Sequence, residues 1–285
     1  GRALRTAEMR PTDRMTGLTI TLIFTVISLL ALGPHLAVLF LALGDDWYGS
    51  MLPARLTLDH FRAALGNELT LPSIANSLRY AGASTFLDLI LGSAVAWVLV
   101  RSRIRGRAFL DGLVMLPLSV PGIVLAFGYL ALSREGKPLD FLIHDGDPFF
   151  LMVVAYAMRR LPYVVRAMSA GLLQISPVLE EAALNLGASP RRSFVRITLP
   201  LALPSLVAGG VLAFAFAMLE VSDSMILAQR TIHFPITKAI YTLAGTIGEG
   251  PALAAALGVW AMVFLIILLI GLSLLVGRKV ANLVR

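Results

Sequence analysis

The chain has 285 residues, of which 58% are hydrophobic, and its mean hydropathy is +0.83. This composition exceeds what a water-soluble domain normally carries and excludes an ordinary soluble globular protein. The net charge of +7 could suggest a nucleic-acid partner, but the distribution of the basic residues along the chain argues against one. Because cysteine is absent, disulfides and thiolate metal sites are excluded as well.

Apolar segments recur along the chain, and a helix of about 20 residues crosses a hydrocarbon core of about 30 Å. We therefore predict an all-α fold, a polytopic membrane helix bundle with about six transmembrane helices in one domain over residues 1–285. The predicted spans are residues 17–43, 77–100, 110–132, 149–166, 201–228 and 251–276. Arginines precede the first span as in a signal peptide, but its length and the lack of a clean cleavage pattern favour a retained span.

Alternate loops between these spans differ in charge. Seventeen of the 24 basic residues fall in residues 1–16, 101–107, 159–196 and 277–285, and the other seven fall in the remaining segments. Positive charge stays on the cytoplasmic side during insertion. We therefore expect an inner (plasma) membrane protein with a cytoplasmic arm at 1–16, a cytoplasmic tail at 277–285 and both termini in the cytoplasm.

The first outer loop and the third span carry the clearest local signals in the first half of the chain. Residues 44–76 mix polar and apolar side chains, which predicts a periplasmic segment with a short surface helix, and Asn76 and Ser77 are suited to cap the second span. In the third span, Pro117, Pro121 and Gly122 predict a kinked or broken helix. Irregular backbone needs protein or a wet cavity around it in a bilayer, so we expect this span inside the bundle, where it serves either packing or a pathway.

A cytoplasmic segment over residues 172–200 shows the signals of a short helix. Ser176 suits the N-cap, Pro177 suits the first helical position, and Glu180 and Glu181 place negative charge near the positive end of the helix dipole. Gly187 is suited to the left-handed conformation that follows a helix C-terminus. These residues predict a helix that ends at Gly187.

The cap-and-proline signal recurs at Ser189 and Pro190. It predicts a second helix that runs through the arginines at 191, 192 and 196 and stops before Pro200. The whole segment is therefore expected to form a helix-turn-helix on the cytoplasmic face. Small residues at 208–217 and 252–258 let the last two spans approach other helices closely, either within the chain or in another subunit.

The 172–200 segment also resembles a known signature. Its pattern is Glu181-Ala182-Ala183, three residues, Gly187, nine residues, then Ile197-Thr198-Leu199-Pro200. The pattern and its place between the fourth and fifth predicted spans resemble those of the permeases of binding-protein-dependent ABC importers. This resemblance covers most of the chain beyond about residue 54 and implies the type I fold of that family and a single permease domain.

In that family the short helix docks into a cleft on an ATPase subunit, so the resemblance implies an ATPase-coupling role for part of the 172–200 segment. The alternative is an interfacial helix that only ends a span. The coupling residues implied by position are Glu180, Glu181, Ala182, Ala183, Gly187, Ile197, Leu199 and Pro200.

The resemblance also implies partners. The chain lacks the phosphate-binding loop Gly-x-x-x-x-Gly-Lys-Ser/Thr, so we expect no enzyme activity and no cofactor in it, with ATP and Mg on a separate subunit. The implied partners are an ABC ATPase dimer, a periplasmic or lipoprotein solute-binding protein and a second permease unit that is identical, related or fused. Membrane lipid surrounds the chain, and no nucleic acid is expected.

Two acidic residues fall inside the fifth predicted span. Carboxylates are costly there unless they face a bundle interior or a wet cavity, so Glu220, Asp223 and the adjoining Ser224 are substrate-path candidates. The alternative is that the two acids cap a helix or pair with another one. Asp88 and Asp111 are weaker candidates, and Asp111 lies close enough to the basic 101–107 loop to pair there.

The cargo is suggested by resemblance alone. Residues 181–189 look more like the iron, polyamine, thiamine, phosphonate and sulfate branch than like the sugar branch, and residues 120–125 and 234–241 resemble ferric-iron permeases most. Ferric iron is thus the favoured small polar solute. The alternative functions are an ATP-independent secondary transporter or channel, and an intramembrane enzyme. The enzyme is disfavoured because no catalytic motif or metal-ligand cluster is found.

Overall fold

The structure is a computed structural model that describes residues 13–45, 47, 50 and 52–283, and from residue 275 onward only the backbone. The predicted all-α fold is confirmed, apart from a small antiparallel pairing of β1 (Gly44–Asp45) with β2 (Arg55–Leu56). The helices of the described part are α1 (Arg14–Leu43), α2 (Asp59–Gly66), α3 (Thr70–Arg101), α4 (Arg107–Ser119), α5 (Gly122–Leu132), α6 (Phe149–Gln174), α7 (Pro177–Asn185), α8 (Pro190–Ser193), α9 (Leu199–Met218), α10 (Ser222–Leu227), α11 (Ile236–Ala244) and α12 (Gly250–Leu283).

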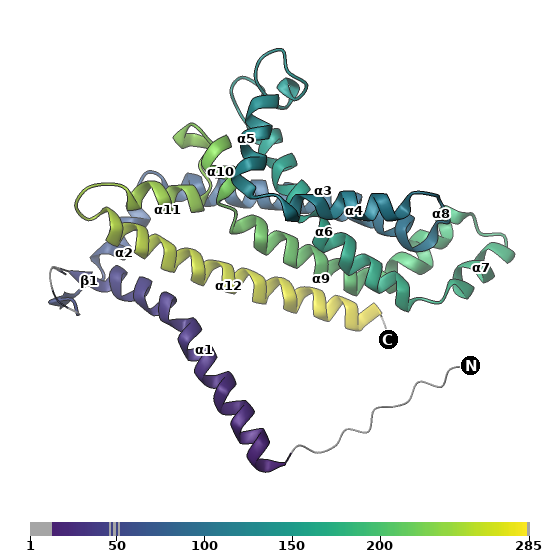
Figure 1. Cartoon of the computed structure of the whole chain (residues 1–285), viewed down its shortest axis with the longest axis horizontal. Coiled ribbons are helices and arrows are strands. Elements are labelled where there is room, and N and C mark those ends of the chain that lie inside the picture. The colour runs from purple at the N-terminus through teal and green to yellow at the C-terminus, as the bar shows by residue number, and fades with distance from the viewer. Residues whose placement is uncertain (1–12, 46, 48–49, 51, 284–285) are drawn as a thin grey trace.

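Helices α3, α6, α9 and α12 run side by side along the long axis (Figure 1). Helix α7 lies at one end of the molecule, and α2, α11 and the small sheet lie at the other (Figure 1). The short helix predicted within residues 44–76 is α2. The predicted arm at 1–16 lies mostly outside the described residues, and α12 continues through the predicted tail as far as Leu283.

Fewer than six helices qualify as spans by length and composition. In the described residues, four do so, namely α1, α3, Pro190–Met218 and the Gly250–Leu274 part of α12, and the bent pair α4 and α5 makes a fifth if it counts as one span. The predicted fourth span is α6, whose 26 residues suffice to cross a bilayer. It fails on composition because it carries Arg159, Arg160 and Arg166. Two of these side chains are paired inside the bundle, as described below.

The predicted break in the third span is confirmed. Helices α4 and α5 meet at an angle of 102° across Val120 and Pro121. Gly122 is required at this bend, because a Cβ at that position would collide with the Arg159 guanidinium and with Ser222. The expected burial of this span is not seen in the single chain, where Val114 and Ala126 are the buried residues of the pair.

Small residues bring the helices of the core together. A Cβ added at Gly92 of α3 would lie 2.7 Å from Val164 of α6, and one added at Gly209 of α9 would lie 2.8 Å from Ala167. At the other end, Ala254 and Ala256 of α12 are buried in a cluster with residues of α2 and α11. In these places the small residues of the last two spans serve contacts within the chain.

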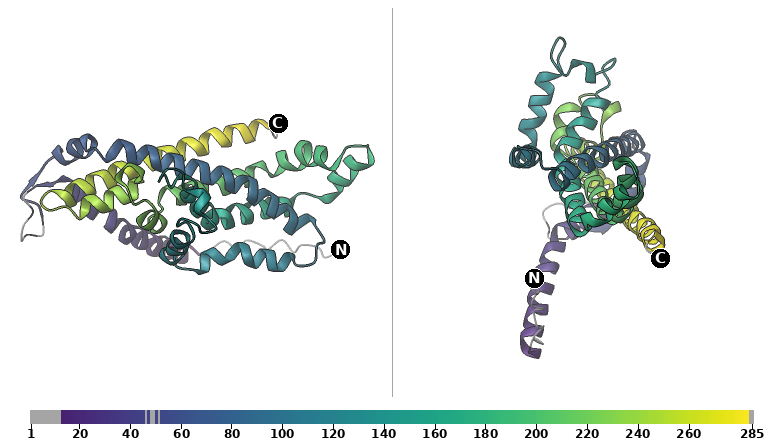
Figure 2. Two further views of the ribbon diagram at one scale, coloured as in Figure 1. Left: turned by 90° about the horizontal axis from the view of Figure 1, so that it is seen from above. Right: turned by 90° about the vertical axis from the view of Figure 1, so that its right-hand side faces the viewer.

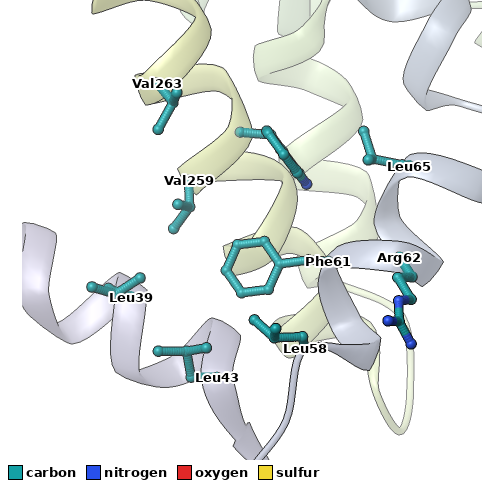
Figure 3. A pocket seen from close by; sticks show the side chains of 9 residues that line it. Leu39, Leu43, Leu58, Phe61, Arg62, Leu65, Val259 and Val263 are labelled. Atoms are coloured by element: carbon teal, nitrogen blue, oxygen red, sulfur yellow. The ribbon is translucent and has the colours of Figure 1, made fainter.

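Helix α1 stands apart from the bundle. It diverges from α12 toward its N-terminus (Figures 1 and 2), and among its residues only Ala42, near its C-terminus, is buried. At that end an apolar groove of about 460 Å³ opens between α1, α2 and α12, with Leu39, Phe61 and Val259 among its lining residues (Figure 3). An apolar helix of this length with so much exposed surface fits a lipid or protein neighbour rather than water.

The predicted capping of the second span by Asn76 and Ser77 is wrong. Helix α3 begins earlier, at Thr70. The proline at position 72 does not prevent this, because the N–H groups of the first turn have no partner within the helix. Both residues instead serve another helix. The Ser77 hydroxyl accepts a hydrogen bond from the Ile236 N–H (2.8 Å) and so caps α11, while the Asn76 amide donates to the carbonyls of Ile232 (2.7 Å) and Phe234 (3.2 Å).

Candidate functional site

The 172–200 segment forms its first helix as predicted. Helix α7 has Ser176 at its N-cap and Pro177 at its first position, and Gly187 follows its C-cap with φ of +85°. The Gly187 N–H donates to the Leu184 carbonyl (2.9 Å) and the N–H of the next residue donates to the Ala183 carbonyl (3.0 Å). This pair of bonds is the Schellman arrangement, which needs a residue that adopts positive φ readily. Gly187 therefore ends α7 for a local, conformational reason.

Helix α7 lies at the end of the molecule (Figure 1), and several of its apolar side chains are exposed. None of its residues is buried, and Val178, Leu184 and Leu186 are exposed, Leu186 at 89%. Glu181 and Ala182 are exposed as well. Exposed leucines beside a cap glycine on a polar loop are typical of a protein-binding surface.

Glu180 differs from its neighbours because its side chain points back into the bundle. One of its carboxylate oxygens lies 3.0 Å from the Arg101 guanidinium and accepts a hydrogen bond from the Thr198 hydroxyl (3.1 Å). Arg101 also donates to the carbonyls of Leu172 (3.0 Å) and Ile175 (2.8 Å). These contacts tie α7 to the ends of α3 and α6 and to the turn before α9. Of the predicted coupling residues, Glu180 is thus an anchor rather than part of the exposed surface.

The second helix of the segment does not stop before Pro200. Helix α8 continues through a π-helical turn, Phe194–Thr198, directly into α9. In this turn the Leu199 N–H donates to the Phe194 carbonyl. Leu199 donates the last bond of the π turn, because the next residue, Pro200, has no N–H with which to continue the series. Ile197 and Leu199 are half-buried and Pro200 is exposed.

A buried ion cluster, consisting of Arg159, Arg160, Glu220 and Asp223, lies where the predicted fifth span breaks. Helix α9 ends at Met218 and α10 begins at Ser222, so Glu220 lies between them. Its carboxylate forms a close ion pair with Arg160 and lies 3.5 Å from Arg159. The Asp223 N–H donates to Glu220 (2.9 Å), so the same carboxylate caps α10.

The other two path candidates lie in α10 and are fully buried. The Asp223 carboxylate lies 3.7 Å from Arg160 and 4.0 Å from Arg159, and neither of its oxygens has a hydrogen-bond partner in the described residues. The Ser224 hydroxyl donates to the Val221 carbonyl (2.8 Å). From the sequence, the two acids are expected either to line a substrate path or to pair with another helix and cap one. The geometry matches pairing and capping.

The sequence assignment missed the two arginines of the cluster. The distribution of basic residues predicts cytoplasmic positions for Arg159 and Arg160, whereas the structure places them in the middle of α6, paired with acids of the α9–α10 break. Removing them from the cytoplasmic side still leaves most basic residues there. Their position inside a predicted span was the available signal, because an ionisable residue at membrane depth needs a partner.

The structure also locates the two weaker candidates, Asp88 and Asp111. Asp88 of α3 is fully buried and has no hydrogen-bond partner in the described residues. Asp111 does not pair with the 101–107 loop but with Arg166 of α6, through two contacts of 3.1 Å each.

The 234–241 stretch that suggested an iron cargo has a structural role. The Lys238 ammonium donates to the carbonyls of Met225 (2.9 Å) and Ala228 (2.5 Å) at the end of α10, and the Thr237 hydroxyl donates to the Glu220 carbonyl (2.5 Å). Burial lowers the pKa of Lys238 from its ordinary value. These residues hold α11 against the α9–α10 break. Within the described residues, no group of three or more His, Asp or Glu side chains is placed to hold a metal ion.

Comparisons with known proteins agree with these features. The family model for the binding-protein-dependent transport system inner membrane component matches residues 88–279. A putative ferric transport system permease protein from Haemophilus influenzae is 34% identical over 187 residues, which are 63% of this chain and 29% of that protein. The molybdenum transport system permease protein of Escherichia coli K12 is 36% identical over 186 residues, which are 60% of this chain and 79% of that protein.

Solved structures match over more of the chain. A chain of a bacterial ABC transporter for import of the acidic polysaccharide alginate superposes with a TM-score of 0.70 at 20% identity, covering 95% of this chain and 98% of that chain. An inward-facing methionine ABC transporter gives a TM-score of 0.58 at 21% identity, covering 76% and 97%. The fold is thus that of type I ABC importer permeases. With the matched family model, it follows that the chain belongs to the family of inner membrane components of binding-protein-dependent transport systems, the permeases of ABC importers.

Proposed function

We propose that this chain is the transmembrane permease subunit of an ATP-driven importer and that α7 couples it to an ABC ATPase. The observation that carries this proposal is the exposed apolar surface of α7, held on the bundle by the buried contact of Glu180 with Arg101. A helix that only ended a span would need neither feature. ATP and Mg are bound by the partner, and the chain itself catalyses no reaction.

The contact between Glu180 and Arg101 explains how a displacement of α7 is transmitted to the transmembrane helices. Arg101 and Glu180 connect α7 with α3, α6 and the turn before α9, and α3, α6 and α9 pack on one another. Displacement of α7 by closing ATPase subunits therefore moves three packed helices together, which is how alternating access is achieved by rigid-body motion. We place the break between α9 and α10, with Glu220, Asp223 and Ser224, along the translocation path, where the buried ion cluster supports its wall.

The partners and cargo follow from the same proposal. The divergent α1 suits contact with a second permease unit, and a solute-binding protein would deliver the cargo from the periplasmic side. Both termini are placed in the cytoplasm by the distribution of basic residues. For the cargo we favour ferric iron, which is supported by the name of the Haemophilus influenzae relative, with molybdate second because of the Escherichia coli relative.

Co-purification with an ATPase tests the coupling proposal. Leu186→Asp places a charge on the exposed surface of α7, and Ile247→Asp is a matched control in the fully exposed loop between α11 and α12. We expect the ATPase to co-purify in mild detergent with the native chain and with Ile247→Asp, and to be lost from Leu186→Asp. Equal recovery with both variants would show that α7 is not the docking element.

Uptake by cells tests the cargo separately. Cells that lack their own uptake systems for iron and molybdate and that express the transporter should accumulate radiolabelled ferric iron. This uptake should stop when ATP is depleted. Accumulation of molybdate in place of iron would overturn the ferric assignment and leave the coupling proposal standing. Uptake that persists without ATP would favour a secondary transporter or channel.

A further inference from the structure

A second groove, lined by apolar walls and rimmed by arginines, lies at the α7 end of the bundle. It has a volume of about 390 Å³ and is bounded by the end of α3, the start of α4 and the second half of α6. Leu99 and Leu173 are among its apolar lining residues, and its charged lining residues, here called the rim, are Arg107, Arg166 and Asp111. It does not overlap the buried ion cluster or the exposed surface of α7.

The rim carries more positive charge than the chain neutralises. Arg166 is paired with Asp111, and at the other end of the loop Arg101 is committed to Glu180. Arg107 has one long contact, 3.5 Å to the Ser102 carbonyl, and forms no ion pair with any described residue. Arg103 and Arg105 are exposed, and neither forms an ion pair in the described part of the chain. Arg107 is therefore available to an anion in the groove, and Arg103 and Arg105 lie on the same loop.

Two further donors face the same place. Helix α4 begins at the rim, and its N-cap is Gly106, with φ of +97° and no side chain to satisfy the N–H groups of the first turn. Those N–H groups attract negative charge. Ser169 of α6 lines the groove, and its hydroxyl is buried without a hydrogen-bond partner in the described residues. A buried hydroxyl without a partner calls for an explanation, and a ligand in the groove supplies one.

The surroundings of the groove specify a ligand that is anionic at one end and apolar along its length. Apart from the charged residues and Ser169, the lining of the groove is apolar and includes Leu99, Val100 and Leu173. Basic pockets between transmembrane helices at the cytoplasmic boundary bind the head groups of anionic lipids. A free phosphate would use the rim but leave the apolar walls unoccupied.

We propose that this groove binds an anionic phospholipid. Its phosphate lies at Arg107, the α4 N-terminus and the Ser169 hydroxyl, with Arg103 and Arg105 completing the charge complement, and an acyl chain lies along Leu99 and Leu173. Its assignment to the cytoplasmic leaflet rests on the orientation proposed above, whereas the binding itself does not. The lipid would brace α4 against α6 next to Arg101, the residue that anchors α7.

Native mass spectrometry of the chain in its purified complex in detergent, titrated with phosphatidylglycerol or phosphatidylcholine, tests this proposal. Arg105→Gln/Arg107→Gln, the rim variant, removes one charge of the rim and one of the adjoining loop, and Arg134→Gln/Lys137→Gln removes two exposed charges from the loop between α5 and α6 as a matched control. Each basic residue near a membrane surface contributes roughly fivefold to anionic lipid binding, so the rim variant should bind phosphatidylglycerol about 25-fold more weakly. Ala108→Trp fills the groove at unchanged charge and should weaken binding as well.

The outcomes separate the lipid from other ligands. We expect the native chain and the control variant to retain phosphatidylglycerol in preference to phosphatidylcholine, and excess inorganic phosphate not to displace it. Equal retention by the rim and control variants, equal retention of both lipids, or displacement by phosphate would each overturn the proposal. So would loss of a protein subunit from the purified complex, in place of lipid, in the rim variant, because the groove would then be a protein interface.

Discussion

At the residue scale, Glu180 and Glu220 hold the chain together where its helices are interrupted. Glu180 accepts from Arg101 and Thr198 beside α7, and Glu220 accepts from Arg160 and from the first turn of α10. In each place one carboxylate satisfies a guanidinium and a second donor that would otherwise be unpaired. Breaking a buried ion pair by removing one partner is costly because the other charge remains buried.

Glu220→Gln should therefore destabilise the protein strongly. The substitution leaves Arg160 buried without its closest counter-charge, and we expect a loss of about 3 kcal/mol in the free energy of unfolding. Thermal unfolding in detergent measures the change. Asp223→Asn is the matched control, because the Asp223 oxygens form no hydrogen bond in the described residues, and it should cost under about half as much. A larger loss in Asp223→Asn would show that Asp223, not Glu220, holds the buried ion cluster.

At the scale of elements, α7 combines a local stop signal with a long-range anchor. Gly187 ends the helix by adopting positive φ, and apart from its two neighbours in the chain no described residue comes within 4 Å of the position that its Cβ would occupy. Space in the isolated chain therefore admits a side chain there, while the backbone conformation resists a branched one. Position 187 could require a small residue for contact with a docked ATPase, or only a residue that adopts positive φ. These two requirements can be tested separately.

Two substitutions of Gly187 separate these requirements. Gly187→Val should cost about 1–2 kcal/mol in folding free energy, because β-branched residues are strained at positive φ. Gly187→Asn should cost much less, because asparagine tolerates that conformation. If α7 docks closely, both variants should lose the ATPase on co-purification while only the valine variant loses thermal stability. An asparagine variant that keeps its ATPase would limit Gly187 to ending the helix.

At the scale of the whole molecule, the path of the chain between α4 and α6 determines how many times it crosses the membrane. The pair α4 and α5 bends by 102°, as a broken span or a re-entrant loop would, and α6 carries three arginines. Basic-residue distribution favours a crossing by the pair and a return crossing by α6.

Cysteine labelling decides this because the native chain has no cysteine. Single substitutions at Ile104, Glu135 and Leu186, all exposed, sample the loop before α4, the loop after α5 and the end of α7. With a membrane-impermeant maleimide, we expect Glu135→Cys to react in intact spheroplasts and the other two only after permeabilisation. Labelling of all three from the same side would make α4 and α5 a re-entrant loop.

The sequence by itself determined the features that depend on neighbours along the chain. Apolar segment lengths indicated the helices of the bundle, and Pro121 with Gly122 located the break in the third span. Pro177 and Gly187 marked the start and end of α7, because backbone preference acts within a few residues, and Ser176 takes the N-cap position without a side-chain capping bond. The resemblance of the 181–200 pattern indicated the family.

Only the tertiary structure decided which groups meet across the bundle. Arg160 and Glu220 are 60 residues apart, and Arg101 and Glu180 are 79 apart, so no local rule could pair them. Ser77 caps α11 rather than its own helix for the same reason. Charges at membrane depth must find partners, but which partners they find depends on how helices pack, and packing is a property of the whole chain. The anchor of α7 and the buried ion cluster therefore emerged from the fold.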